Sequence, residues 1–189
     1  PIFDVPVIVG GAANYTAALH LMRTGAAGVL VGFGGGAVTA TRTTIGVHAP
    51  MATAIADVAE ARRDYMDESG GRYVQVIADG GMGDSGSFVK ALAMGADAVM
   101  LGAPLARATE APGGGKHWGA EARHQTLPRG SRTDVGTVGS LEQILFGPSH
   151  RADGQVNYIG ALRRAMASTG YVDVKSFQRC SVVVNPYHV

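Results

Sequence analysis

The sequence is poor in cysteine, since Cys180 is the only one among 189 residues. A single thiol excludes an intrachain disulfide framework and every metal or cluster site built from several cysteines. It fits a reducing compartment, so we expect a cytoplasmic protein. Net charge is lacking too, because 16 basic residues against 15 acidic ones leave +1. Such a chain has no overall field to attract nucleic acid or an anionic membrane.

Long apolar runs are also absent. No stretch approaches the roughly 20 apolar residues that span a bilayer, although 46% of the residues are hydrophobic. We therefore expect a compact globular protein with neither a membrane nor nucleic acid among its partners. The chain begins at Pro1 without an initiator methionine or a signal-peptide pattern and soon enters a strand-like run. This beginning predicts that further residues precede Pro1 in the natural protein.

Glycine is abundant, with 28 residues that gather where apolar runs end. Four of these runs are typical of buried parallel strands, and they cover residues 5–9, 28–32, 72–78 and 98–102. Helical patterns over 16–23, 52–67 and 87–94 alternate with them, as in right-handed β/α crossovers. The segment 33–50 between two of these elements is rich in glycine and threonine and is expected to form a loop.

The last third of the chain breaks this alternation. Residues 107–158 carry repeated glycine and proline and predict an inserted segment. A final amphipathic helix is expected over 158–168, with Ile159, Leu162 and Met166 on one face. That face is suited to packing against the last strand.

Four parallel strands fit either half of a (β/α)8 barrel or one half of a doubly wound sheet, and periodicity does not separate the two. A dinucleotide-binding doubly wound sheet needs a Gly-x-Gly-x-x-Gly turn that opens a helix after the first strand. Here Gly10-Gly11 is followed by Ala-Ala-Asn, and the glycines from Gly32 to Gly36 lead into the threonine-rich loop. A half barrel is therefore favoured, because a complete one needs roughly 250 residues.

Three glycine turns follow the second, third and fourth strands, at 34–37, 79–81 and 102–103. Carboxyl ends of parallel strands meet at one edge, where main-chain N–H groups bind phosphate. None of the three turns brings a lysine, so a phosphate here would be held by the main chain. The alternative is that each glycine only permits a tight turn.

Asp79 is the candidate carboxylate, because an unpaired charge at the end of an apolar strand is costly to bury. A ribose diol would satisfy both of its oxygens. The alternatives are a cap for the helix beginning near Ser85, or an ion pair with a lysine. The six histidines lack the spacing of a metal site, and most of them are expected to be surface or packing residues. Trp118 is suited either to covering a ligand or to anchoring the inserted segment.

These residues bear a specific resemblance to a known family. The segment Val29–Pro50 contains Val-Gly-Phe-Gly-Gly-Gly-Ala-Val-Thr-Ala-Thr-Arg, which resembles the catalytic loop of IMP dehydrogenases and GMP reductases, usually Val-Gly-x-Gly-Pro-Gly-Ser-x-Cys-Thr-Thr-Arg. Val76–Gly81 is similar to their phosphate and ribose turn, and Gly95–Gly102 to their last barrel strand. Glu110–Gly113 and Gly160–Gly170 are similar to the stretches that flank their mobile flap. The resemblance covers nearly the whole chain in the family's order.

The resemblance implies an α/β fold that is the C-terminal half, about four β/α units or strands 5–8, of a TIM (β/α)8 barrel. Residues 1–189 would form one barrel domain, incomplete at the N-terminus, with 107–158 as a flap-like insertion. It implies a purine-nucleotide oxidoreductase that converts IMP to XMP with NAD, in GMP biosynthesis, or a GMP reductase that uses NADPH. The family further implies NAD or NADP, potassium and a homo-oligomer, normally a tetramer.

The resemblance also assigns roles by position. Main-chain carbonyls of Gly34 and Gly36 would bind potassium. The nicotinamide would lie beside Gly32, Phe33 and Gly34. The nucleotide would be held by Gly36, Ala37, Asp79, Gly80, Gly81, Gly102 and Ala103.

The departures from the family pattern bear on catalysis. Thr39 stands where the family's cysteine attacks the purine, whereas Thr41 and Arg42 keep the following Thr-Arg. Ala37 replaces a serine that contacts phosphate, and Arg123 could replace an arginine lost from the flap. A threonine hydroxyl is a far weaker nucleophile than a thiolate. Cys180 lies beyond the final helix and is expected to be a buried packing residue.

These differences are similar to those of a bacterial branch called IMP dehydrogenase-related proteins, which varies at the cysteine position. They leave three hypotheses for the activity. The protein is a purine-nucleotide oxidoreductase, a nucleotide-binding regulator without catalysis, or a different enzyme on the same half barrel.

Overall fold

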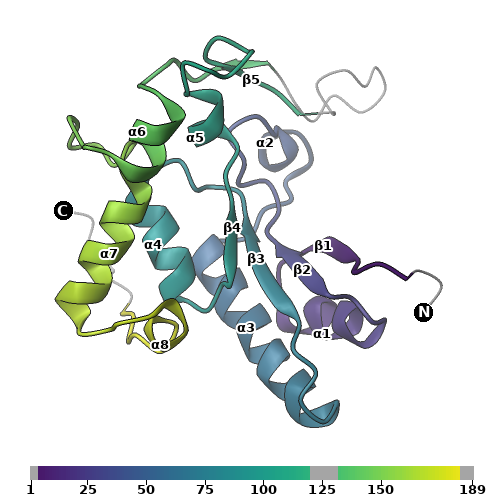
Figure 1. Cartoon of the computed structure of the whole chain (residues 1–189). Coiled ribbons are helices and arrows are strands. Elements are labelled where there is room, and N and C mark those ends of the chain that lie inside the picture. The colour runs from purple at the N-terminus through teal and green to yellow at the C-terminus, as the bar shows by residue number, and fades with distance from the viewer. Residues whose placement is uncertain (1–3, 120–131, 184–189) are drawn as a thin grey trace.

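The computed structural model describes residues 4–119 and 132–183. Its centre is a four-stranded parallel sheet in the order β1-β2-β3-β4 (Figure 1). The strands are β1 (Ile8–Ala12), β2 (Gly28–Val31), β3 (Gln75–Asp79) and β4 (Ala98–Met100). Within the described residues the order follows the sequence and never reverses. A doubly wound sheet reverses its order at the ligand-binding crevice, so this sheet lacks the feature that defines that alternative.

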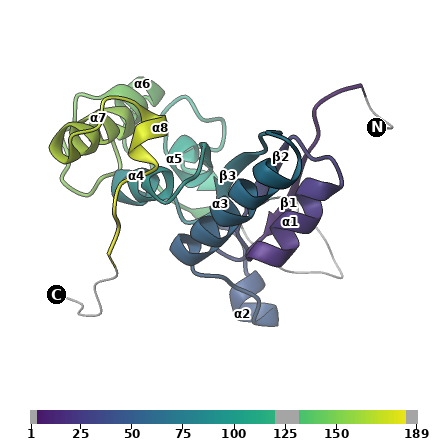
Figure 2. The same ribbon diagram turned by 90° about the horizontal axis from the view of Figure 1, so that it is seen from below.

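The helices between the strands cover one face of the sheet. They are α1 (Tyr15–Arg23), α3 (Met51–Glu68) and α4 (Ser85–Ala93). The side chain of Asn14 caps α1 by accepting a bond from the Ala17 N–H group at 2.9 Å. Viewed from below, α1 and α3 lie side by side across the sheet (Figure 2). The predicted helices were therefore right in type and in place.

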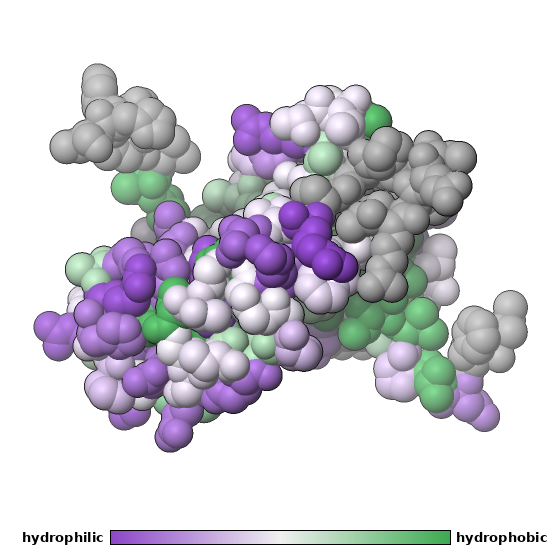
Figure 3. All heavy atoms as spheres, turned by 90° about the horizontal axis from the view of Figure 1, so that it is seen from above, coloured by the Kyte–Doolittle hydropathy of each residue, from purple (hydrophilic) through white to green (hydrophobic). Residues whose placement is uncertain are grey.

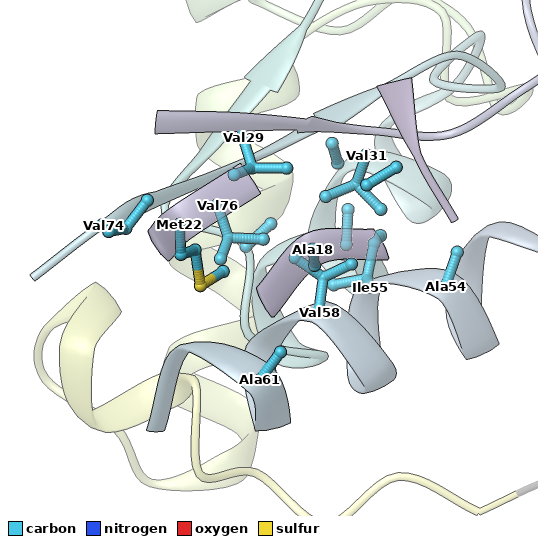
Figure 4. Close-up of a cluster of buried hydrophobic side chains, with 14 of the residues drawn as sticks. Ala18, Met22, Val29, Val31, Ala54, Ile55, Val58, Ala61, Val74 and Val76 are labelled. Carbon is cyan, nitrogen blue, oxygen red and sulfur yellow. The ribbon is translucent and has the colours of Figure 1, made fainter. Parts of the chain in front are cut away.

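The main core lies between these helices and the sheet. Alternate strand residues point into it, as Val76 and Ala78 do from β3, and both are fully buried. Figure 4 shows valines of β2 and β3 directed toward Met22 of α1 and Ile55 of α3. Small alanines on both helices let the backbones approach the sheet closely.

The other face of the sheet is open in the described structure. Ile8 of β1 is 54% exposed and Met100 of β4 is 47% exposed, and Val7 just before β1 is exposed as well. In the view from above, apolar surface lies beside the N-terminal residues (Figure 3). A soluble domain rarely leaves one whole sheet face uncovered. This face therefore needs a covering layer that these residues do not supply.

The remainder of the chain forms short elements. They are α2 (Thr41–Ile45), α5 (Ala103–Ala106), β5 (Lys116–His117), β6 (Thr133–Asp134), α6 (Leu141–Phe146), α7 (Tyr158–Thr169) and α8 (Val174–Phe177). Strands β5 and β6 form a small antiparallel pair. Figure 1 shows α2, α5 and β5 near the end of the sheet where β2 and β4 finish.

Several boundaries differ from the prediction. β1 begins at Ile8 and includes the two glycines that were expected to close it, and β3 begins at Gln75 and includes Asp79. The segment expected to be wholly loop contains helix α2. α7 was expected to pack against the last strand; Leu162 lies in a cluster with Leu92 and Ala93 of α4, and Val99 of β4 packs against the same cluster. The apolar side of α4 is wide enough to carry both the sheet and α7, which a single-helix pattern does not reveal.

The segment 107–158 is partly integrated into the core. Ile144 of α6 is fully buried in a cluster with Val156 and Tyr158. The Phe88 ring of α4 meets Tyr158 edge to face, with 5.6 Å between ring centroids. Part of the predicted insertion thus contributes a buried apolar cluster of its own.

A polar network surrounds Asp97, which directly precedes β4. The Arg62 guanidinium of α3 forms an ion pair with Asp97, and their side chains are only 6% and 13% exposed. The carboxylate also accepts bonds from Tyr73 Oη and from the Val76 N–H group at 2.8 Å. Burial alone raises the pKa of Asp97, but these hydrogen bonds and the guanidinium outweigh it and hold the pKa below its usual value.

Candidate nucleotide site

Three turns at the carboxyl ends of β2, β3 and β4 enclose one cavity of about 430 Å³. All seven residues that the sequence assigned to the nucleotide line it: Gly36, Ala37, Asp79, Gly80, Gly81, Gly102 and Ala103. They come from three segments separated by long stretches of sequence. Parallel strands bring them together because their carboxyl ends share one edge of the sheet.

A smaller hollow of about 270 Å³ adjoins this cavity. It is lined by Gly32, Phe33, Gly34, Thr39 and Thr41, the residues expected to border the nicotinamide and to stand at the cysteine position. The two hollows share residues, namely Gly35, Gly36, Asp79 and Gly80. The loop after β2 therefore separates two compartments that both reach Asp79.

The turns after β2 and β3 touch through their backbones. A Cβ atom added at Gly80 would lie 3.0 Å from the Gly36 nitrogen. One added at Gly32 would lie 2.4 Å from the Asp79 carbonyl oxygen and 2.7 Å from Met51 Sδ. Both residues also have positive φ, at 105° for Gly80 and 130° for Gly32. At these two positions glycine is required by space as well as by conformation.

Gly32→Ala should therefore lower the free energy of unfolding by about 3 kcal/mol, because strain at positive φ adds to overlap with the Asp79 backbone. Urea denaturation of both variants measures this. Gly46→Ala is the matched control, since Gly46 has a φ of 71° and nothing within 4 Å of an added Cβ. Gly46→Ala should lower the free energy of unfolding by about 1 kcal/mol. Equal losses in the two variants would contradict the close packing at Gly32.

Asp79 has no hydrogen-bond or ion-pair partner among residues 4–119 and 132–183. Burial raises the pKa of its carboxyl group. Of the two structural alternatives for Asp79, the helix cap is wrong, and the pairing with an unseen lysine finds no partner among the described residues. Helix α4 is capped by Asp84, whose carboxylate accepts the Ser87 N–H at 2.8 Å, and no described lysine pairs with Asp79. The carboxylate is thus aimed at a cavity with its hydrogen-bonding capacity unused.

Thr39 and Thr41 form a hydroxyl pair at the start of α2, with 2.8 Å between their Oγ1 atoms. The Thr41 N–H group also donates to Thr39 Oγ1 at 3.3 Å. Such contacts hold the Thr39 side chain in place at the edge of the smaller hollow. A threonine hydroxyl at this position is a weaker nucleophile than a cysteine thiolate.

The loop after β2 can supply main-chain oxygens to a cation. Gly34 and Gly36 line the smaller hollow, and the Gly36 carbonyl accepts the Thr39 N–H at 3.4 Å. A carbonyl oxygen keeps a second lone pair, so this bond leaves room for a cation. Within the described residues no group of three or more His, Cys, Asp or Glu side chains is placed to hold a metal. The main-chain carbonyls are thus the groups that this loop offers to a cation.

Two cationic or ionisable side chains that were not predicted line the nucleotide cavity. Arg107 follows α5 and donates to the Gly83 carbonyl at 2.8 Å and the Val135 carbonyl at 3.3 Å. His117 of β5 has its Nε2 atom 2.9 Å from the Cβ position of Gly102. Most of the histidines were expected to be surface or packing residues, and His117 is one that also lines the cavity. Its place depends on the pairing of β5 with β6, for which the sequence holds no motif.

Other candidates lie elsewhere. Arg123 falls outside the described residues. Cys180 packs beside the cluster of Leu162 and Phe177 and not at the cavity, but it is only half-buried, so the expectation of a buried residue is wrong. Trp118 lines a separate apolar groove with Leu101 and Leu105, and Arg132 lies over its ring at 4.7 Å. Trp118 therefore borders the nucleotide cavity without lining it.

No helix in the described part of the chain is both long and apolar enough to cross a membrane.

Comparison with known proteins gives one consistent result. The family model described as the IMP dehydrogenase/GMP reductase domain matches residues 2–142. An uncharacterized oxidoreductase of Mycobacterium leprae is 55% identical over 186 residues, covering 96% of this chain and 49% of that protein. Inosine-5'-monophosphate dehydrogenase of Methanocaldococcus jannaschii is 32% identical over 219 residues, covering 97% and 41%.

A solved structure is similar as well. The IMP dehydrogenase/GMP reductase-like protein of Corynebacterium glutamicum superposes with a TM-score of 0.90 at 57% identity. The match covers 97% of this chain and 48% of that one. The chain thus spans about half the length of the relatives that it matches.

Proposed function

The chain belongs to the IMP dehydrogenase/GMP reductase family, and from that premise we propose that it carries the nucleotide site of an oxidoreductase that converts IMP to XMP with NAD. The observation that carries this proposal is the cavity that joins three glycine turns to the Asp79 carboxylate, which has no partner among the described residues. A ribose diol offers two hydroxyl donors to one carboxylate, and glycine turns offer main-chain N–H groups to a phosphate. A nucleoside monophosphate has both groups.

The barrel architecture is part of this proposal. The four strands are parallel and in sequence order, and the inner face carries exposed Ile8 and Met100. A TIM barrel has parallel strands in sequence order around a packed interior, so an isolated half would leave inward-facing side chains uncovered. We assign residues 1–189 to the C-terminal half, strands 5–8, with 107–158 as the flap-like segment. A first half, present in a longer chain, would cover the open face.

Each of the seven residues assigned to the nucleotide then has a proposed role. Asp79 binds the ribose hydroxyls. Ribose and phosphate are further held by Gly36, Ala37, Gly80, Gly81, Gly102 and Ala103. The low side-chain bulk in these turns supports this role, because the backbone must approach the ligand closely.

The smaller hollow suits the cofactor. NAD or NADP supplies the hydride-accepting or hydride-donating ring. Phe33, which is 39% exposed at this hollow, offers a flat apolar surface beside Gly32 and Gly34. Carbonyls of Gly34 and Gly36 would hold potassium and so fix the loop that carries Thr39. A homotetramer is proposed on family grounds.

The Thr39 position favours two alternatives to the dehydrogenase. A threonine hydroxyl is a far weaker nucleophile toward a purine than the thiolate that the family uses at this position. The protein could therefore be a purine-nucleotide-binding regulator, or it could be a GMP reductase with a different reacting group. Arg123, which lies outside the described residues, stays a proposed catalytic residue.

The test is an absorbance assay at 340 nm on the full-length protein with potassium, giving IMP with NAD and, separately, GMP with NADPH. Formation of NADH supports the dehydrogenase, whereas loss of NADPH makes the protein a GMP reductase. If neither reaction exceeds a control without enzyme while IMP or GMP raises the melting temperature, the regulator is the better account. If neither nucleotide binds, the purine assignment is wrong.

Thr39→Cys should raise the rate of the supported reaction by about tenfold or more, because a thiolate is a stronger nucleophile than a hydroxyl. The same 340 nm assay measures it, with Thr39→Ser as the control that keeps a hydroxyl. Thr39→Ser should not raise the rate. A cysteine variant that binds IMP but gains no turnover would favour the regulator.

A further inference from the structure

The nucleotide cavity has an unfavourable charge balance for a phosphate. Asp79 and Asp84 both line it, and each carries a carboxylate. Asp84 is partly compensated, because it accepts the Ser87 N–H and hydroxyl groups as the cap of α4. A phosphate monoester dianion brought close to two carboxylates is repelled unless a cation offsets them.

The three turns do not supply that cation. Apart from Asp79, their lining residues are glycines and alanines, among them Ala37 and Ala103. These residues offer main-chain N–H donors but neither hydroxyl groups nor charge. Among the described residues that line the cavity, Arg107 is the sole arginine or lysine.

Arg107 is held firmly while its charge stays uncompensated. Its Nη1 atom donates to the Gly83 carbonyl in the turn after β3, and its Nε atom donates to the Val135 carbonyl just after β6. Neither acceptor carries a full charge. Across residues 4–119 and 132–183 no carboxylate forms an ion pair with Arg107. The two bonds use two of the five guanidinium N–H donors, so three are left for a ligand.

We propose that Arg107 recognises the phosphate of the bound nucleotide and thereby selects nucleoside monophosphates over nucleosides. The guanidinium would donate charge-assisted hydrogen bonds to phosphate oxygens and offset the carboxylates of Asp79 and Asp84. The purine and ribose in this inference rest on the proposed function. The preference for a phosphate monoester rests on the charges and contacts around Arg107 alone.

The test is calorimetric titration of the full-length protein with IMP and with inosine. Arg107→Met should weaken IMP binding by about tenfold to a hundredfold, the range of one or two charge-assisted hydrogen bonds. Inosine binding should not change, so the preference for the monophosphate falls. Arg107→Lys keeps the charge without the planar fork and should recover part of the preference. Arg164→Met, on the exposed side of α7, removes the same charge away from the cavity and should change neither affinity.

Several outcomes overturn the inference. If Arg107→Met weakens the binding of IMP and of inosine equally, Arg107 has only a structural role, connecting the segments of Gly83 and Val135. The same conclusion follows if the preference for the monophosphate survives the substitution. Loss of the preference in His117→Gln instead would assign the phosphate to His117. A wild-type protein that binds IMP no tighter than inosine also rejects it.

Ribose 5-phosphate separates this inference from the proposed function. If it binds and requires Arg107 while IMP and GMP do not bind, phosphate recognition stands and the purine assignment fails. If IMP binds equally well with and without Arg107, the purine assignment stands and the role of Arg107 fails. If none of these ligands binds, both fail.

Discussion

Asp97→Asn is expected to lower the free energy of unfolding by about 3–5 kcal/mol at pH 7, because it leaves a buried arginine without its counter-charge. The Arg62 residue is only 5% exposed, so water cannot replace the lost carboxylate. The Tyr73 hydroxyl, the Val76 N–H group and the Gln178 amide all donate to the same carboxylate. An asparagine side chain can accept fewer of these bonds and turns an amide toward at least one donor.

Urea denaturation of wild type and variant at pH 7 measures this loss. Asp153→Asn is the control, since the Asp153–Arg151 pair is 39% and 38% exposed. An exposed pair of this kind contributes at most about 1 kcal/mol. A loss at Asp97 no larger than in the control would contradict the buried network.

The pH dependence of the Asp97 effect has a definite sign. Its pKa in the folded protein is held below the ordinary value, which is about 3.9 for an aspartate in an unfolded chain. The stabilisation is therefore present above about pH 4 and is lost as the pH falls through the lower, folded pKa. The difference between wild type and Asp97→Asn should be constant from pH 6 to pH 8 and shrink in acid.

Asp79→Asn is expected to weaken IMP binding by about a hundredfold or more without destabilising the protein. Two hydrogen bonds from ribose hydroxyls to a charged acceptor account for a loss of that size. In the unliganded protein the charge is costly, because burial raises the pKa of Asp79 and no described residue partners it. Removing that charge should leave the melting temperature unchanged or raise it.

Calorimetry with IMP and thermal unfolding without ligand test the two halves of this prediction. Asp67→Asn on the exposed side of α3 is the control and should change neither quantity. Folding raises the pKa of the Asp79 carboxyl group. Its contribution to the free energy of unfolding is therefore fully present below the pKa of the unfolded chain, and it is lost as the pH rises through the pKa of the folded protein. The increase in stability caused by Asp79→Asn should thus appear at neutral pH and vanish in acid. A variant that binds IMP normally would remove Asp79 from the site.

Much of the fold was predictable from local patterns. The four strands were recognised because β-branched runs ending in glycine are typical of parallel strands, and the helices because their apolar residues recur at helical spacing. The boundaries of β1 and β3 were less accurate. The hydrophobicity of the sequence changes gradually at these boundaries, whereas hydrogen bonding to β2 decides where each strand begins.

The glycine turns of the site were also predictable. Parallel strands must bring their carboxyl ends to one edge, so Gly36, Asp79 and Gly102 had to be neighbours if the strands were right. Arg107 and His117 were not predictable in the same way. Neither belongs to a motif, and their positions depend on short elements that only tertiary contacts define.

The sequence by itself determined the family, the parallel β/α alternation and the identity of the turn residues, because these depend on local spacing and on steric demands at glycine. Only the tertiary structure decided the charge of the site and the partners of its acids. It placed Arg107 against Gly83, capped α4 with Asp84 and left Asp79 facing the cavity. Electrostatic interactions depend on distances between residues far apart in the chain, and a linear pattern does not contain those distances.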